Sequence, residues 1–83
     1  MDGYVIFTNP KTNKTIVRTR GGKYSVLAVP ESVSLKTGDL ISGKLDMPGE
    51  VRVVNLTQRQ MFPAQIQLAH SDVASKAKQK ASA

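Results

Sequence analysis

The chain has 83 residues and no cysteine, so it suits one small domain whose core is reinforced neither by disulfides nor by a cysteine-based metal site. Twelve lysines and arginines against six acids give a net charge of +6, which suits nucleic acid or another acidic partner. No apolar run approaches the roughly 20 residues of a membrane helix, and no secretory signal opens the chain, so we expect a cytoplasmic protein without membrane contact.

Six short runs rich in β-branched and aromatic residues, separated by turn signals, predict strands along the first 70 residues. The expected strands are residues 3–8, 14–20, 23–29, 38–45, 50–57 and 62–70. Gly21 and Gly22 supply the positive φ angles of a tight hairpin turn between the second and third strands. Gly43, inside the fourth strand, predicts the bulge or bend by which small sheets curl into barrels. Residues 31–37 are interpreted as a polar connection, with a brief strand or a single helical turn left open.

The last of these runs alternates most regularly and predicts a half-buried antiparallel strand. Its apolar positions are Ala64, Ile66 and Leu68, and its polar positions are Gln65 and Gln67. From residue 71 the composition changes to alanine, serine, lysine and glutamine, which predicts a flexible basic tail over 71–83. The fold class expected for residues 1–70 is therefore all-β, a small antiparallel barrel of five to six strands.

The second expected strand is unusually basic. Lys14, Ile16, Arg18 and Arg20 share one parity, so they project from one face of a regular strand, and we expect that face to meet a polyanion rather than the core. The predicted phosphate contacts are Lys11, Lys14, Arg18, Arg20, Lys23, Arg52 and Arg59. Clustered cations are typical of phosphate binding, but charges at a hairpin end also protect a strand edge from aggregation, and both interpretations stay open.

Read in order, four short segments resemble a cold-shock domain over about residues 3–57. The segments are Gly3-x-Val5-x-Phe7-x-Asn9-x-Lys11, Gly21-Gly22, Ser34-Leu35-Lys36-x-Gly38-Asp39 and Asn55-Leu56. The resemblance implies a five-stranded OB-type barrel that binds single-stranded nucleic acid by stacking bases on aromatic side chains. It also implies a stacking position for Phe7, where the family keeps a tryptophan. The segments aligned with the two RNA-binding motifs of the family, 11–16 and 24–28, lack most of the aromatic residues of those motifs.

Phe7 and Tyr24 are the candidate stacking residues. Phe7 shares the parity of Val5, which favours a place in the core, against the role that the resemblance implies. Tyr24 shares the parity of Val26 but lies beside Lys23 at the end of the hairpin, so core and surface both stay open for it.

We predict a protein that binds single-stranded DNA or RNA, mainly through phosphate contacts and with little sequence specificity. The alternative is a β-barrel adaptor or inhibitor that binds another protein. His70 is the only imidazole and the acids are scattered, so we expect no enzyme activity, no metal site and no cofactor. A monomer or a weak homodimer is expected.

Overall fold

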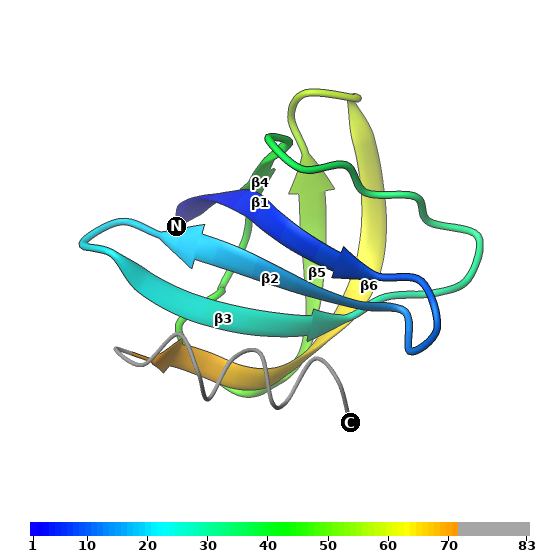
Figure 1. Cartoon of the computed structure of the whole chain (residues 1–83). Helices are drawn as coiled ribbons and strands as arrows, with labels where there is room; N and C mark the ends of the chain where they lie inside the picture. Colours follow the sequence, from blue (N-terminus) through cyan, green and yellow to red (C-terminus); the bar gives the residue numbers. More distant parts are fainter. Residues whose placement is uncertain (72–83) are drawn as a thin grey trace.

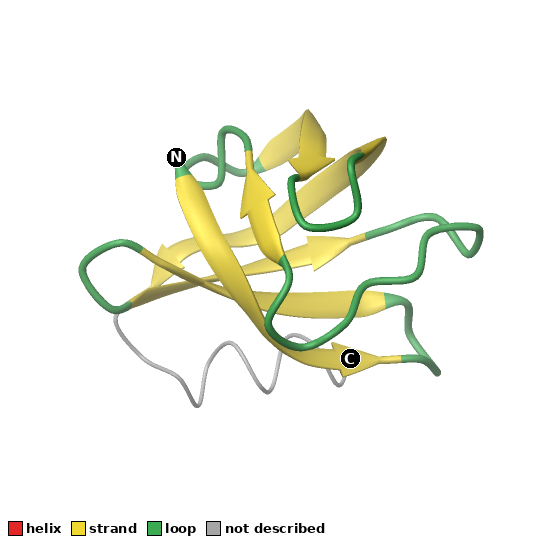
Figure 2. Cartoon of the chain, turned by 90° about the horizontal axis from the view of Figure 1, so that it is seen from above, coloured by secondary structure: helices red, strands yellow, loops and turns green. Residues whose placement is uncertain are grey.

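The computed structural model describes residues 1–71, which form six β-strands and no helix. The strands are β1 (Asp2–Asn9), β2 (Lys14–Thr19), β3 (Lys23–Ala28), β4 (Leu40–Ser42), β5 (Gly49–Asn55) and β6 (Gln60–Ser71). They close into an antiparallel barrel in the order β1-β2-β3-β6-β5-β4, in which β4 returns to β1 (Figures 1 and 2). The predicted all-β barrel is confirmed. Ser71 ends β6, so of the predicted tail over 71–83 only this residue is described.

Every strand sends at least one fully buried aliphatic side chain into the barrel. These residues are Val5, Val17, Leu27, Ile41, Val53 and Ile66, each at most 1% exposed. Leu35 and Leu45 reach the same core from the two long loops that flank β4. Because burying one such side chain contributes about 1.5–3 kcal/mol, this ring is the main source of cohesion in a barrel that has no covalent crosslink.

Register shifts in two strands, β1 and β6, reverse the alternation of their side chains. In β1, Val5 pairs with Val17 but Phe7 pairs with Ile16, so one extra residue separates the two pairs. Phe7 therefore turns to the outside of the barrel and is 41% exposed. The core position that parity favours for this phenylalanine is wrong, because a parity argument assumes an unbroken strand.

The pairing of β6 with β3 shifts register twice, and the shift next to Ile66 has the same effect on the last strand. Leu27 pairs with Ile66, but the next pair joins Val26 to Leu68, with Gln67 between them. Leu68 consequently packs outside the barrel, while Ala69 packs against the core. The predicted alternation of buried and exposed side chains holds from Ala64 to Ile66. The prediction that Leu68 lies on the same face as Ile66 is wrong.

A second, smaller apolar cluster lies on the outer side of β2, β3 and β6. Ile16 and Val26 form its centre and are 1% and 0% exposed, with Tyr24 and Leu68 packed against them. The charges of β2 predict an exposed outer face. Arg18 is exposed on that face, but Ile16 is buried.

The fourth strand is much shorter than predicted. Only Leu40–Ser42 is strand, and β4 pairs with β5 through two residues, so within the described residues the first half of β5 has no strand on that side. Gly43 bends the chain, and a Cβ there would lie 3.2 Å from the carbonyl oxygen of Arg52. Leu45 then turns into the barrel, where its carbonyl accepts a 2.6 Å hydrogen bond from Ser25 Oγ. Residues 31–37 form no strand and no helix, and the segment opens with a turn closed by a 3.0 Å hydrogen bond from Val33 N–H to the Pro30 carbonyl.

A buried polar network joins β1, β4 and β5 at the other end of β4. Asp39 is 5% exposed, and its Oδ2 accepts hydrogen bonds from Lys36 N–H at 3.0 Å, Asn55 Nδ2 at 2.9 Å and Gln58 Nε2 at 2.8 Å. Its backbone carbonyl accepts the N–H of Val5 at 2.9 Å. Burial by itself would raise the pKa of Asp39, but these hydrogen bonds and the positive charge of Lys36 outweigh burial and lower it. The carboxylate therefore stays ionised at neutral pH.

Candidate nucleic-acid interface

The outer surface of β1, β2 and β3, called the β1–β3 face below, brings three aromatic side chains together around an arginine. Tyr4 lies opposite Arg18 on β2, and Arg18 lies opposite Tyr24 on β3. The bulge in β1 adds Phe7 to the same surface. Since neighbouring strands are about 4.8 Å apart, the two tyrosines stand about 10 Å from each other with the Arg18 position between them.

The aromatic residues of this face differ in exposure. Tyr4 is 57% exposed and Phe7 is 41% exposed, with the bulge residue Ile6 between them at 40%. Tyr24 is half-buried against Ile16 and the rest of the outer cluster. Tyr4 and Phe7 are thus the side chains most available to a flat ligand.

Tyr4 is the site residue that the sequence reasoning missed. A signal for it was present, since its parity is opposite to that of Val5 and therefore predicts an outward side chain. Its pairing with Arg18 is a long-range fact that depends on the register of β1 with β2.

Two arginines of the predicted set, Arg18 and Arg20, lie beside this surface. Arg18 and Arg20 are both exposed, and within residues 1–71 neither guanidinium makes an ion pair. The Arg18 side chain runs toward the β2–β3 turn, where a Cβ on Gly22 would lie 3.4 Å from its Nη2. The positive φ angles of Gly21 and Gly22, 83° and 76°, confirm the predicted glycine turn.

The predicted lysines extend the positive charge along β2. Lys11 is exposed in the β1–β2 turn, at the opposite end of β2 from Arg20. Lys14 and Lys23 are half-buried and make interactions of their own. At about 3.3 Å per residue, the cations along β2 span about 20 Å.

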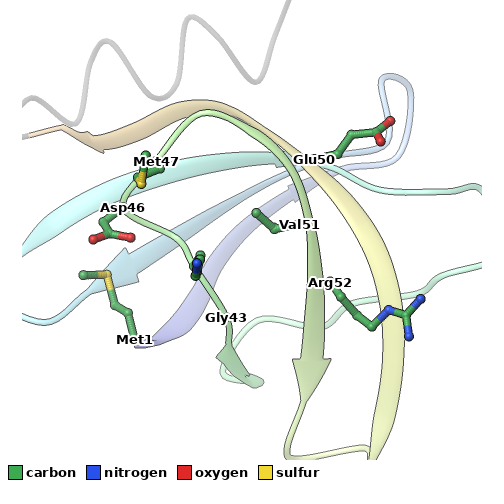
Figure 3. A pocket seen from close by; sticks show the side chains of 8 residues that line it. Met1, Gly43, Asp46, Met47, Glu50, Val51 and Arg52 are labelled. Carbon is green, nitrogen blue, oxygen red and sulfur yellow. The ribbon is translucent and has the colours of Figure 1, made fainter.

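Arg52 lies away from this surface, whereas Arg59 lies in the turn that hydrogen-bonds to Leu40, the β4 neighbour of Tyr4. Arg52 is on β5, which is separated from β2 by two strands in either direction around the barrel, and Arg59 is in the β5–β6 turn with a φ of 56°. A cleft of about 670 Å³ lies beside β5, lined by the β4–β5 loop and Met1. Figure 3 shows the Arg52 side chain pointing away from Met1 and Met47 of this cleft. The predicted set of cations is therefore divided, with Arg52 on the other side of the barrel from Arg18 and Arg20.

A different cleft opens on the β1–β3 face itself, beside Tyr4. It measures about 550 Å³, within the usual range of small-molecule sites. Its lining includes Asp2, Tyr4, Ile6, Arg18, Arg20 and Leu40. An aromatic side chain, two aliphatic side chains and charges of both signs thus meet around one hollow.

Residues 1–71 contain no group of three or more histidine, cysteine or acidic side chains that could hold a metal ion. Among the same residues no helix is long and apolar enough to span a membrane.

No family model, curated protein or solved structure matches this chain. The resemblance to cold-shock domains consequently remains a prediction, and any function has to be argued from the surface of the barrel.

Proposed function

We propose that the protein binds single-stranded DNA or RNA on the β1–β3 face, mainly through phosphate contacts and with little sequence specificity. The observation that supports this most directly is the grouping of Tyr4 and Phe7 on β1 and Tyr24 on β3, on either side of Arg18 on β2. Exposed aromatic side chains interleaved with unpaired guanidiniums are the two elements of a single-strand binding surface.

Stacking and charge act together on this surface. A base stacked on an aromatic side chain contributes about 1–3 kcal/mol, so Tyr4 and Phe7 together contribute about 2–6 kcal/mol. Arg18 and Arg20 add a salt-dependent contribution, because each neutralised phosphate releases counterions. Neither stacking nor phosphate contact distinguishes strongly between bases, so most of the bound strand is not read for sequence.

The proposal is tested by fluorescence anisotropy with labelled thymidine and uridine oligonucleotides of about 12 nucleotides, at about 50 and 200 mM salt. Arg18→Ala/Arg20→Ala is expected to weaken binding at least tenfold. It should also reduce the slope of log affinity against log salt by about 1.4, since each single-strand phosphate contact contributes about 0.7. Tyr4→Ala should weaken binding by about 5- to 150-fold, the equivalent of one lost stack.

Arg52→Ala is the control for the loss of a positive charge, because Arg52 lies on β5, which is separated from β2 by two strands in either direction around the barrel. Its affinity for the oligonucleotide should stay within about twofold of the wild type, because a charge outside the contact surface has only a small effect on binding. A loss of affinity per removed charge as large for Arg52→Ala as for Arg18→Ala/Arg20→Ala would show a general charge effect and refute the β1–β3 face as the site. Failure of the wild type to bind at low salt would refute nucleic-acid binding altogether.

A protein-binding adaptor is the second candidate, and exposed apolar side chains near the β5–β6 turn favour it. Leu56 and Met61 are 47% and 60% exposed, and Met61 pairs with the half-buried Val54. Exposed apolar side chains gathered on one surface are typical of protein contacts. A wild type that binds no oligonucleotide at low salt would leave this as the better explanation.

A further inference from the structure

We propose that the cleft beside Tyr4 binds one guanine base of the single strand, with the carboxylate of Asp2 accepting the donors of its Watson–Crick edge. This inference rests on the proposed function and adds to it a preference at one position of the strand. It concerns the hollow of about 550 Å³ between β1, β4 and the β2–β3 turn.

The walls of the cleft suit a flat aromatic ligand. Tyr4 on β1 lies directly opposite Leu40 on β4, and Ile6 follows Tyr4 two residues along the strand. Tyr4 is 57% and Ile6 40% exposed, so both present their side chains to the hollow. A base can stack on the tyrosine ring while its edge contacts the aliphatic side chains.

Asp2 is an acceptor at the edge of that hollow without a fixed partner. It has the same parity on β1 as Tyr4, so both side chains project from the outside of the barrel. Within residues 1–71 its carboxylate makes no hydrogen bond and no ion pair, even though Arg18 and Arg20 line the same cleft. Its two oxygens are therefore available to a ligand.

Guanine is the base whose edge matches a carboxylate. Its N1–H and N2–H are adjacent donors, and an ionised carboxylate offers two acceptor oxygens side by side. Adenine and cytosine each place one amino donor beside a ring acceptor, and the N3–H of thymine or uracil lies between two carbonyl oxygens. These acceptors repel the second carboxylate oxygen, so only guanine forms two hydrogen bonds with Asp2.

The two arginines then hold the strand on either side of the bound base. Arg18 and Arg20 line the cleft and are exposed, so their guanidiniums can reach the phosphates next to a base stacked on Tyr4. A bidentate contact to a base provides about 5- to 150-fold discrimination, and in a cleft open to solvent we expect about 5- to 20-fold.

The test compares three labelled thymidine oligonucleotides of about 12 nucleotides, unmodified or with one central guanosine or inosine. Inosine keeps N1–H and lacks the N2 amino group. The wild type should bind the guanosine strand about 5- to 20-fold more tightly than the other two. Asp2→Asn should abolish this preference while binding the unmodified strand at least as well, since it removes a negative charge from the surface. Glu50→Gln, an exposed acid on β5, is the matched control and should keep the preference.

The outcomes separate this inference from the proposed function. Binding of the unmodified strand without a preference for guanosine overturns the guanine site and leaves the proposed function standing. A preference that survives Asp2→Asn, or that inosine shares fully, overturns the role of the carboxylate. If no strand binds, both proposals fail together.

Discussion

The Asp39 network offers the sharpest test of how the barrel is closed between β4 and β5. Asp39→Asn keeps the shape of the side chain and removes its charge, while Lys36 N–H, Asn55 and Gln58 still point at one oxygen. A hydrogen bond to a charged acceptor contributes about 1.5–3 kcal/mol, against about 0.5–1.5 kcal/mol for a neutral one. The difference of about 1–1.5 kcal/mol per bond gives about 3–4.5 kcal/mol for three bonds. Because the variant no longer buries a charge, part of this is offset, and we expect a loss of about 2–4 kcal/mol in the free energy of unfolding.

This loss is large for a barrel of this size. At about 0.05–0.15 kcal/mol per residue, the 71 described residues have a free energy of unfolding of about 4–11 kcal/mol. The variant should remain folded at 25 °C, with a Tm lower by about 10–20 °C. Urea unfolding followed by far-UV circular dichroism measures the difference directly.

The pH dependence of stability provides the test that could refute this account of Asp39. The folded-state pKa of Asp39 lies below its ordinary value, so the unfolded chain takes up the proton first as the pH falls. The stability that the charge contributes is fully present above the ordinary pKa of about 3.9 and is lost as the pH falls through the folded-state pKa. The difference between wild type and Asp39→Asn should therefore be constant from pH 7 to about 5 and shrink below about 4. A difference below about 0.5 kcal/mol at pH 7, no larger than that of an ordinary surface substitution, would refute this reasoning, as would one that does not change with pH.

Two further substitutions test the packing that supports the β1–β3 face. Gly3→Ala should lower the free energy of unfolding by about 1–3 kcal/mol in urea titrations, because its Cβ would overlap Val17 Cγ1 and lie 2.9 Å from the Arg18 carbonyl oxygen. Unchanged stability would contradict the register of β1 with β2. Ser25→Ala should cost about 1–3 kcal/mol, since it leaves the Leu45 carbonyl without its buried hydrogen bond. A neutral result by thermal unfolding would show that water replaces the hydroxyl.

Much of the proposed binding surface could be predicted from local sequence. The glycine turn, the exposed Arg18 and Arg20 beyond it, and an aromatic residue at position 24 all follow from the hairpin and its charges. Which other side chains stand beside Arg18 could not be predicted, because Tyr4 becomes its neighbour only through the pairing of β1 with β2. The separation of Arg52 from that surface depends likewise on the order of strands around the barrel.

The sequence by itself determined that this chain forms short strands, where its main turns lie and that the sheet closes into a small barrel. Those features depend on turn chemistry and on alternation over a few residues, which are local properties. Only the tertiary structure decided that Phe7 and Leu68 face outward and that β4 ends at Ser42. A single extra residue at a bulge reverses every side chain after it, and the position of that residue is set by closure of the barrel rather than by its neighbours in the chain.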